Sequence, residues 1–164
     1  MYSPLAIANT IIAKKPGMNQ MGLNKLVYFI HGWSLAYDRS VVGELPGVFS
    51  YGPVYSSLYD ALRHLRMEPI YTAQALAHGC TYPCVPEADT ATHDMIDAVL
   101  AQYGHLTHIQ LSNLAHAEGS PWKQEAAAHK FKVKADHVIP EWRLQQHFKG
   151  RRADHQAQQA LKAA

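Results

Sequence analysis

The apolar and polar positions of this chain follow a helical period over most of its length. The first predicted helix covers about residues 4–15, because Ser3 and Pro4 provide a capping serine and a first-turn proline. The second covers about residues 20–39 and is apolar on most of its sides, which is typical of the central helix of a bundle. The pattern therefore places a buried helix early in the chain.

The second predicted helix also carries polar groups on one side. Asn24, Tyr28 and His31 recur at intervals of three and four residues and share a face. A histidine on such a helix is more often a hydrogen-bonded core residue than a ligand or a base. We expect this face either to meet another helix or to line a groove.

Further helices are predicted from their start signals. Thr107 and Gln110 form a capping box, in which each side chain satisfies the free backbone amide of the other residue. The remaining spans are bounded by proline, glycine and capping residues. They cover about residues 53–65, 90–103, 108–118, 121–130 and 141–149.

Two segments break the helical pattern. The stretch "GVFSY", residues 47–51, alternates well enough for one strand of a small antiparallel pair, and the following "GPV" is expected to end the loop, with Pro53 opening the next helix. Residues 67–90 contain three prolines and a glycine, so we expect an irregular insert there. The predicted fold class is mainly α: a single-domain bundle of about six or seven helices with a small antiparallel β element near residues 40–55.

Length, charge and apolar runs narrow the function classes. A chain of 164 residues has the size of one domain, and its net charge of +2 says little about partners. From Trp122 onward there are nine Lys or Arg residues against four Asp or Glu residues. A basic tail can attract nucleic acid, but no nucleic-acid motif accompanies it, so a nucleic-acid partner is not favoured. No apolar run reaches the ~18 residues of a membrane span, and the start lacks a secretory signal, so we expect a cytoplasmic protein without a membrane partner.

A cluster of metal-ligating residue types lies in the irregular insert. His78, Cys80, Cys84 and His93 fall within sixteen residues and match the ligand count of a structural zinc site. Their spacing fits none of the common zinc patterns. We therefore predict no metal and no other cofactor, and keep these four residues as weak candidates beside the alternative of a flexible insert with reduced cysteines.

Catalytic signals are missing from the sequence, whereas aromatic residues are concentrated in one stretch. The chain has no G-x-S-x-G, no glycine-rich phosphate loop and no H-E-x-x-H, so we predict no catalytic residues and no enzyme activity. Tyr51, Tyr55 and Tyr59 are spaced by four residues. Tyrosine is enriched at protein interfaces, although ordinary core packing explains the spacing equally well.

Several blocks of this sequence, in their order, resemble the Panacea domain, the family that includes SocA-like antitoxins and phage-associated proteins. The blocks are "LNKLVYFIHGWSLA", "GVFSYGPVYSSLYDAL" and "LTHIQLSNLAHAEGSPW", and the last helix "IPEWRLQQHF" also looks like that of the family. The likeness extends from about residue 5 to residue 148. It implies a helical domain over residues 1–150, which leaves residues 151–164 as a basic C-terminal tail.

The resemblance also implies a function and a kind of partner. Members act mostly as antitoxins that bind a toxin directly, and some act as adaptors that deliver a toxin to a protease; neither a cofactor nor catalysis belongs to the family. We therefore expect this chain to bind a cognate toxin encoded next to it. The alternatives are a proteolytic adaptor, with a protease as second partner, and a zinc-binding regulatory module. The residues expected to form or support the partner-binding face are Lys25, Tyr28, His31, Tyr51, Tyr55 and Tyr59.

Overall fold

The computed structural model describes residues 1–76, 79–132, 134 and 136–164. Within these ranges the chain forms seven α-helices, one short 3-10 helix and one two-stranded antiparallel sheet, which confirms the predicted fold class. The elements in chain order are α1 (Pro4–Lys14), α2 (Gln20–Ala36), β1 (Gly47–Phe49), β2 (Gly52–Val54), α3 (Ser56–Leu62), η1 (Arg63–Leu65), α4 (Thr90–Tyr103), α5 (His108–Ala115), α6 (Pro121–Ala128) and α7 (Glu141–Ala163).

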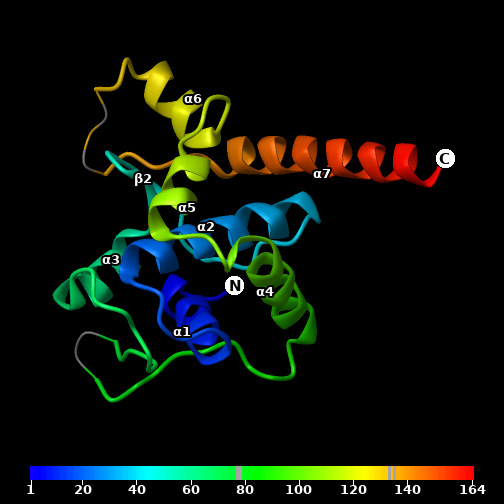
Figure 1. Cartoon of the computed structure of the whole chain (residues 1–164). Helices are drawn as coiled ribbons and strands as arrows, with labels where there is room; N and C mark the ends of the chain where they lie inside the picture. The colour runs from blue at the N-terminus through cyan, green and yellow to red at the C-terminus, as the bar shows by residue number, and fades with distance from the viewer. Residues whose placement is uncertain (77–78, 133, 135) are drawn as a thin grey trace.

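Helix α2 lies at the centre of the molecule, with the other helices arranged around it (Figure 1). Fourteen of its seventeen residues are buried, including the polar residues Asn24, Lys25 and His31. Its predicted start is confirmed at Gln20, but the helix ends at Ala36 rather than near residue 39. The chain turns there because Asp38 adopts a left-handed conformation, with φ of 57°.

Three helix starts that the sequence marked, those of α1, α5 and α6, are confirmed by their caps. The Ser3 side chain accepts a hydrogen bond from the Ala6 amide, and the Thr107–Gln110 capping box is formed in both directions. Ser120 caps α6 in the same way. These starts depend on contacts within four residues, so the local sequence is sufficient to set them.

The small β element is a hairpin, and it corrects one sequence prediction. Strands β1 and β2 pair antiparallel, with Val48 opposite Pro53 and Phe49 opposite Gly52. The "GPV" stretch is therefore a strand rather than the end of a loop, and the next helix begins at Ser56 rather than at Pro53. Proline is tolerated in an edge strand, where its missing N–H breaks no ladder.

The chain between η1 and α4 contains no helix or strand in its described part, which runs over residues 66–76 and 79–89. It is fixed to α1 by side chains instead. The Asn9 amide group donates to the carbonyls of Gln74 and Pro83, at 2.9 and 2.8 Å, and Thr10 Oγ1 accepts from the Val85 amide at 3.0 Å. This irregular segment is thus attached to the core at several points.

Helix α7 has a packed half and an exposed half. Leu144 and Phe148 are fully buried, and Phe148 lies so close to α2 that a Cβ on Gly32 would come within 2.1 Å of its ring. From residue 153 onward every residue is exposed, and this part of the helix projects away from the body (Figure 1). The expected boundary between domain and tail, at residue 150, falls inside this continuous helix.

No helix among the described residues combines the length and the apolar character that crossing a bilayer requires.

Candidate functional site

The polar face of α2 is buried against the hairpin and the start of α3. Asn24 Oδ1 accepts a hydrogen bond from the Tyr55 amide at 3.0 Å, and His31 Nδ1 lies 2.9 Å from the Tyr55 hydroxyl. Burial lowers the pKa of His31 to about 4, so its imidazole is neutral at neutral pH. Asn24 and His31 thus contact Tyr55 at the start of α3, and Tyr28 packs against the Phe148 ring of α7. Asn24 also lines a cavity at the hairpin, so the face has features of both arrangements that the sequence allowed.

Lys25 is the only lysine among the described residues that is buried. Its side chain is 1% exposed, and its ammonium group donates to the Pro53 carbonyl at 2.9 Å. Burial lowers the pKa of Lys25 to about 8, because the charged form loses its hydration. A cation held in this way fixes the backbone of β2 to the central helix.

The hairpin is fixed by side chains from three different helices, which we call the hairpin clamp. Alternate carbonyls along the hairpin each accept one hydrogen bond, and the three donors come from α6, α5 and α2. The bonds are Trp122 Nε1 to Phe49 O at 2.8 Å, Ser112 Oγ to Tyr51 O at 2.7 Å, and Lys25 Nζ to Pro53 O at 2.9 Å. The clamp therefore holds the turn of the hairpin in one position relative to the helical body.

Glycine is required at residue 52 for two reasons. Its φ is 100°, a conformation that side chains with a Cβ rarely adopt. A Cβ at this position would also lie 3.2 Å from Lys25 Cε and 3.6 Å from His116 Nδ1. The backbone of β2 can approach the clamp lysine only because no side chain intervenes.

Exposed and half-buried aromatic and apolar residues gather at the clamped hairpin, and we call them the hairpin surface. Tyr51 is 72% exposed and Tyr59 is 41% exposed. Together with residues of α2 they line a cavity of about 310 Å³. The hairpin surface comprises Met21, Phe49, Tyr51, Tyr59 and Met67, all of which line this cavity.

The six predicted partner-binding residues divide into two groups. Tyr51 and Tyr59 lie on the hairpin surface. The other four, Lys25, Tyr28, His31 and Tyr55, are at most 1% exposed. Lys25 lines the cavity from beneath, whereas the side chains of Tyr28, His31 and Tyr55 are buried in the body of the chain. No sequence pattern marked Ser112 and Trp122 as clamp residues, although Trp122 stands in the "SPW" end of the third block.

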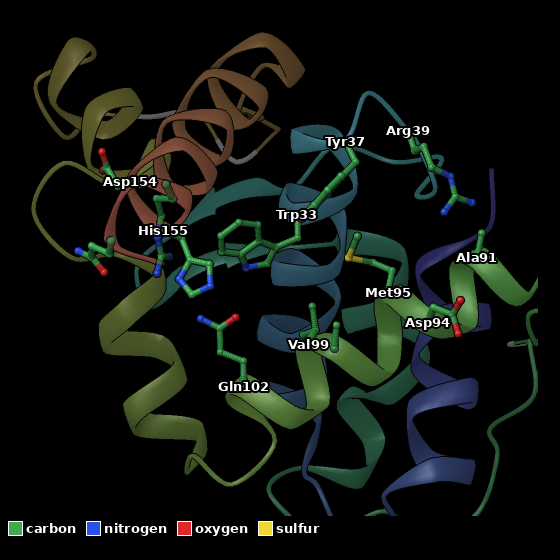
Figure 2. A pocket seen from close by; sticks show the side chains of 13 residues that line it. Trp33, Tyr37, Arg39, Ala91, Asp94, Met95, Val99, Gln102, Asp154 and His155 are labelled. Carbon is green, nitrogen blue, oxygen red and sulfur yellow. The ribbon is translucent and has the colours of Figure 1, made fainter. Parts of the chain in front are cut away.

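A second concave surface lies between α2, α4 and the exposed half of α7 (Figure 2). This groove has a volume of about 650 Å³. Trp33 points into it from α2, opposite Gln102 of α4 and His155 of α7 (Figure 2). The Trp33 indole donates to the Tyr103 hydroxyl at 3.1 Å, which fixes the orientation of the ring.

The groove has mixed charge. Arg39 and Arg151 line it, and so do Asp94 and Asp154. The Arg151 guanidinium lies 5.5 Å from the centre of the Trp33 ring, a distance suited to a cation–π contact. A lining that carries both positive and negative side chains favours neither an acidic nor a basic partner.

The basic residues near the C-terminus do not form one patch. Lys130, Lys132 and Lys134 are exposed in the connection between α6 and α7. Lys149 instead pairs with Asp38, and Arg152 covers the Tyr37 ring at 4.0 Å from the ring centre while donating to the Ala36 carbonyl at 2.9 Å. Lys149 and Arg152 therefore attach α7 to the end of α2.

The four weak metal candidates do not assemble into a site in the part of the chain that the structure describes. Cys80 and Cys84 are exposed free thiols, and His93 lies on α4. His78 lies outside the described residues. The metal-ligating side chains that do converge within those ranges are Glu125, His129 and His137, which the sequence analysis did not consider.

Comparison with known proteins found one matching family and one curated relative. The family described as antitoxin SocA-like, Panacea domain, matches residues 23–123, a span that contains all but the first three residues of α2, the hairpin and all three clamp residues. The curated protein named antitoxin SocA, from Caulobacter vibrioides (strain NA1000 / CB15N), is 27% identical over 125 residues, which cover 71% of this chain and 66% of that protein. No solved structure matches the chain.

Proposed function

Because the chain belongs to the SocA-like antitoxin family that carries the Panacea domain, we propose that it is an antitoxin that neutralises a cognate toxin by binding it directly. It acts by covering the toxin rather than by catalysis, in the cytoplasm, and its toxin is encoded next to it. The clamped hairpin is the single observation that carries this proposal. It presents Tyr51 and Tyr59 on a turn whose backbone is held from three helices.

A rigid aromatic surface suits an inhibitor that must bind tightly. Tyrosine buries a large area on binding, and only two of its side-chain torsion angles become fixed. A surface that is already fixed before binding loses little conformational entropy when the partner binds. Stable complexes bury roughly 800 Å² on each partner, more than two tyrosines provide. The hairpin surface therefore forms the centre of the proposed interface, and neighbouring residues form its rim.

Co-expression tests the proposed function itself. We expect the product of the neighbouring open reading frame to stop growth when it is expressed alone. Co-expression of this chain should restore growth, and the two proteins should copurify. Toxicity that persists in the presence of the folded chain, or rescue without a stable complex, would contradict neutralisation by direct binding.

Single substitutions test the hairpin surface. Tyr51→Ala and Tyr59→Ala should each weaken toxin capture by about tenfold or more, since an aromatic anchor at an interface is worth roughly 2 kcal/mol. The matched control is Tyr82→Ala, because Tyr82 is 57% exposed but lies in the irregular segment. Capture that depends on Tyr82 and not on the hairpin tyrosines would place the interface on that segment and overturn this part of the proposal.

The exposed half of α7 favours one alternative function, that of a proteolytic adaptor. An adaptor needs a surface for the toxin and a separate one for the protease, and residues 153–164 project from the body with every side chain exposed. Deletion of residues 153–164 keeps Arg151 and Arg152 in place. Loss of toxin degradation with retained toxin binding would support the adaptor, whereas unchanged toxin level and growth would reject it.

A further inference from the structure

Three side chains of metal-ligating type converge where α6 ends. His137 Nε2 lies 2.8 Å from Glu125 Oε1, and His129 Nε2 lies 3.3 Å from the same oxygen. All three donor atoms lie within 4.8 Å of one another. Donor atoms in a tetrahedral zinc site are roughly 3.3 Å apart, given Zn–N and Zn–O bonds of about 2.0–2.1 Å. The cluster is therefore close to the spacing that one small ion requires.

The backbone brings these residues together through one local and one long-range arrangement. Glu125 and His129 are four residues apart and share a face of α6, where His129 is the C-terminal cap. His137 is fixed from outside the helix, because its carbonyl accepts a hydrogen bond from the Val48 amide at 2.9 Å. The residue after it, Val138, forms a β-bridge with Gly47. The geometry thus depends on the hairpin strand β1 as well as on α6.

The second oxygen of Glu125 is held by a neighbouring arginine. Arg143 Nε donates to Glu125 Oε2 at 2.7 Å, which leaves Oε1 directed at the two histidines. Burial acts to raise the pKa of the Glu125 carboxyl, but hydrogen bonds from His137 and Arg143 outweigh it and lower that pKa. Partners of this kind commonly orient the ligands of metal sites from outside the coordination sphere.

We propose that Glu125, His129 and His137 form a binding site for one Zn²⁺ ion, with water in the fourth position. Two imidazole nitrogens and one carboxylate oxygen are a donor set that suits zinc. The His129 side chain is 46% exposed, so an ion can enter from solvent and keep a water ligand. The ion would tie the end of α6 to the segment that pairs with β1. The test of this site does not require a toxin.

Cobalt spectroscopy and zinc competition on the full chain test the proposal. Co²⁺ in a tetrahedral site absorbs in the visible range, and thiolate ligands add a charge-transfer band in the near ultraviolet. We expect about one equivalent of Co²⁺ to bind with visible bands and without the thiolate band, and Zn²⁺ to displace it. His129→Ala and His137→Ala should each weaken Zn²⁺ binding by at least about 100-fold in competition with a chelating dye, because loss of a group that only orients a ligand already costs roughly 10–100-fold.

Two control variants separate this site from the other candidates. His105→Ala removes an exposed histidine of the same type and should leave Zn²⁺ binding unchanged. A Cys80→Ser, Cys84→Ser double variant should also bind as the parent chain does. A rise in the melting temperature on addition of Zn²⁺, seen in the parent chain but not in the two histidine variants, would support the site. A thiolate band, binding that survives both histidine substitutions, or no binding at a Zn²⁺ concentration of about 100 μM would overturn it.

Discussion

The hairpin β1–β2 and the exposed half of α7 are both surface features, but they are held in different ways. The hairpin is short, and side chains from three helices bind its carbonyls across 28 to 73 residues of sequence. The exposed half of α7 is long, and from residue 153 onward every side chain is exposed. Isolated helical segments of this length are only marginally stable in water. The contrast teaches that two exposed segments of one chain can differ in how far distant parts of the fold fix their backbone.

The largest expected effect is the loss of folding stability in acid, and it arises from His31 beneath the hairpin region. The pKa of His31 is lowered from 6.5 to about 4 in the folded chain, so the unfolded chain binds the proton first and acid favours unfolding. The stability that His31 contributes is present above pH 6.5 and is lost as the pH falls to about 4, and it amounts to about 3 kcal/mol. Urea denaturation at a series of pH values measures this loss.

The matched variant for that experiment is His31→Gln. It keeps a polar side chain beneath Tyr55 but does not titrate, so its stability should change less between pH 6.5 and 4 than that of the parent. Carboxyl groups such as Glu125 add a loss at lower pH in both proteins and cancel in the comparison. If the free energy of unfolding depends on pH in the same way in both proteins, His31 is not the cause of the loss of stability in acid.

A pair of glycine substitutions compares the two regions directly. Gly52→Ala should lower the free energy of unfolding by about 1–3 kcal/mol, because residue 52 has a left-handed φ and faces Lys25. Gly150→Ala lies in the middle of α7, has no neighbour within 4 Å of the added carbon, and should raise that free energy by about 0.5–1 kcal/mol. Thermal and urea denaturation measure both. Equal effects in the two variants would remove the distinction between a clamped and an unclamped backbone.

Clamp substitutions should have smaller effects that sharpen the comparison. Ser112→Ala and Trp122→Phe each remove one donor to a hairpin carbonyl and should each cost about 1 kcal/mol of stability. Ser50→Ala changes an exposed serine on the same turn and serves as the control. Hydrogen exchange at the Gly52 and Val54 amides should accelerate in the clamp variants alone. Unchanged exchange would mean that the turn is held by strand pairing and not by the clamp.

The smallest effect is expected on the exposed half of α7. Leu161 is 78% exposed, so Leu161→Ala should change the free energy of unfolding by less than about 0.5 kcal/mol. Denaturation in urea checks this value. A loss of more than about 1 kcal/mol would show that this part of the helix is covered in solution.

The features predicted correctly from the sequence are those whose causes lie within a few residues. The starts of α1, α5 and α6 follow from serine or threonine caps, from proline in the first turn and from one capping box. The central position of α2 follows from a helix that is apolar on most sides. These are properties of a short stretch of chain, and tertiary contacts did not alter them.

The features that were missed depend on long-range contacts. Pro53 was expected to open a helix, but the pairing of its strand with β1 and the bond to Lys25 place it in a hairpin. Tyr55 was grouped with Tyr59 by spacing, yet it precedes α3 and points into the core. His137 reaches Glu125 only because its segment pairs with β1. In each case the deciding partner is far away in sequence.

The docking of α7 on α2 has a consequence for how the chain is made. One side of the central helix is covered by residues that are synthesised much later, since 116 residues separate Ala36 from Arg152. At a ribosome speed of roughly 5–20 residues per second, that interval lasts about 6–23 seconds. During this time Gly32 and its neighbours have no cover, and the nascent chain is open to chaperones and to degradation. The packing of the central helix is therefore complete only after this delay.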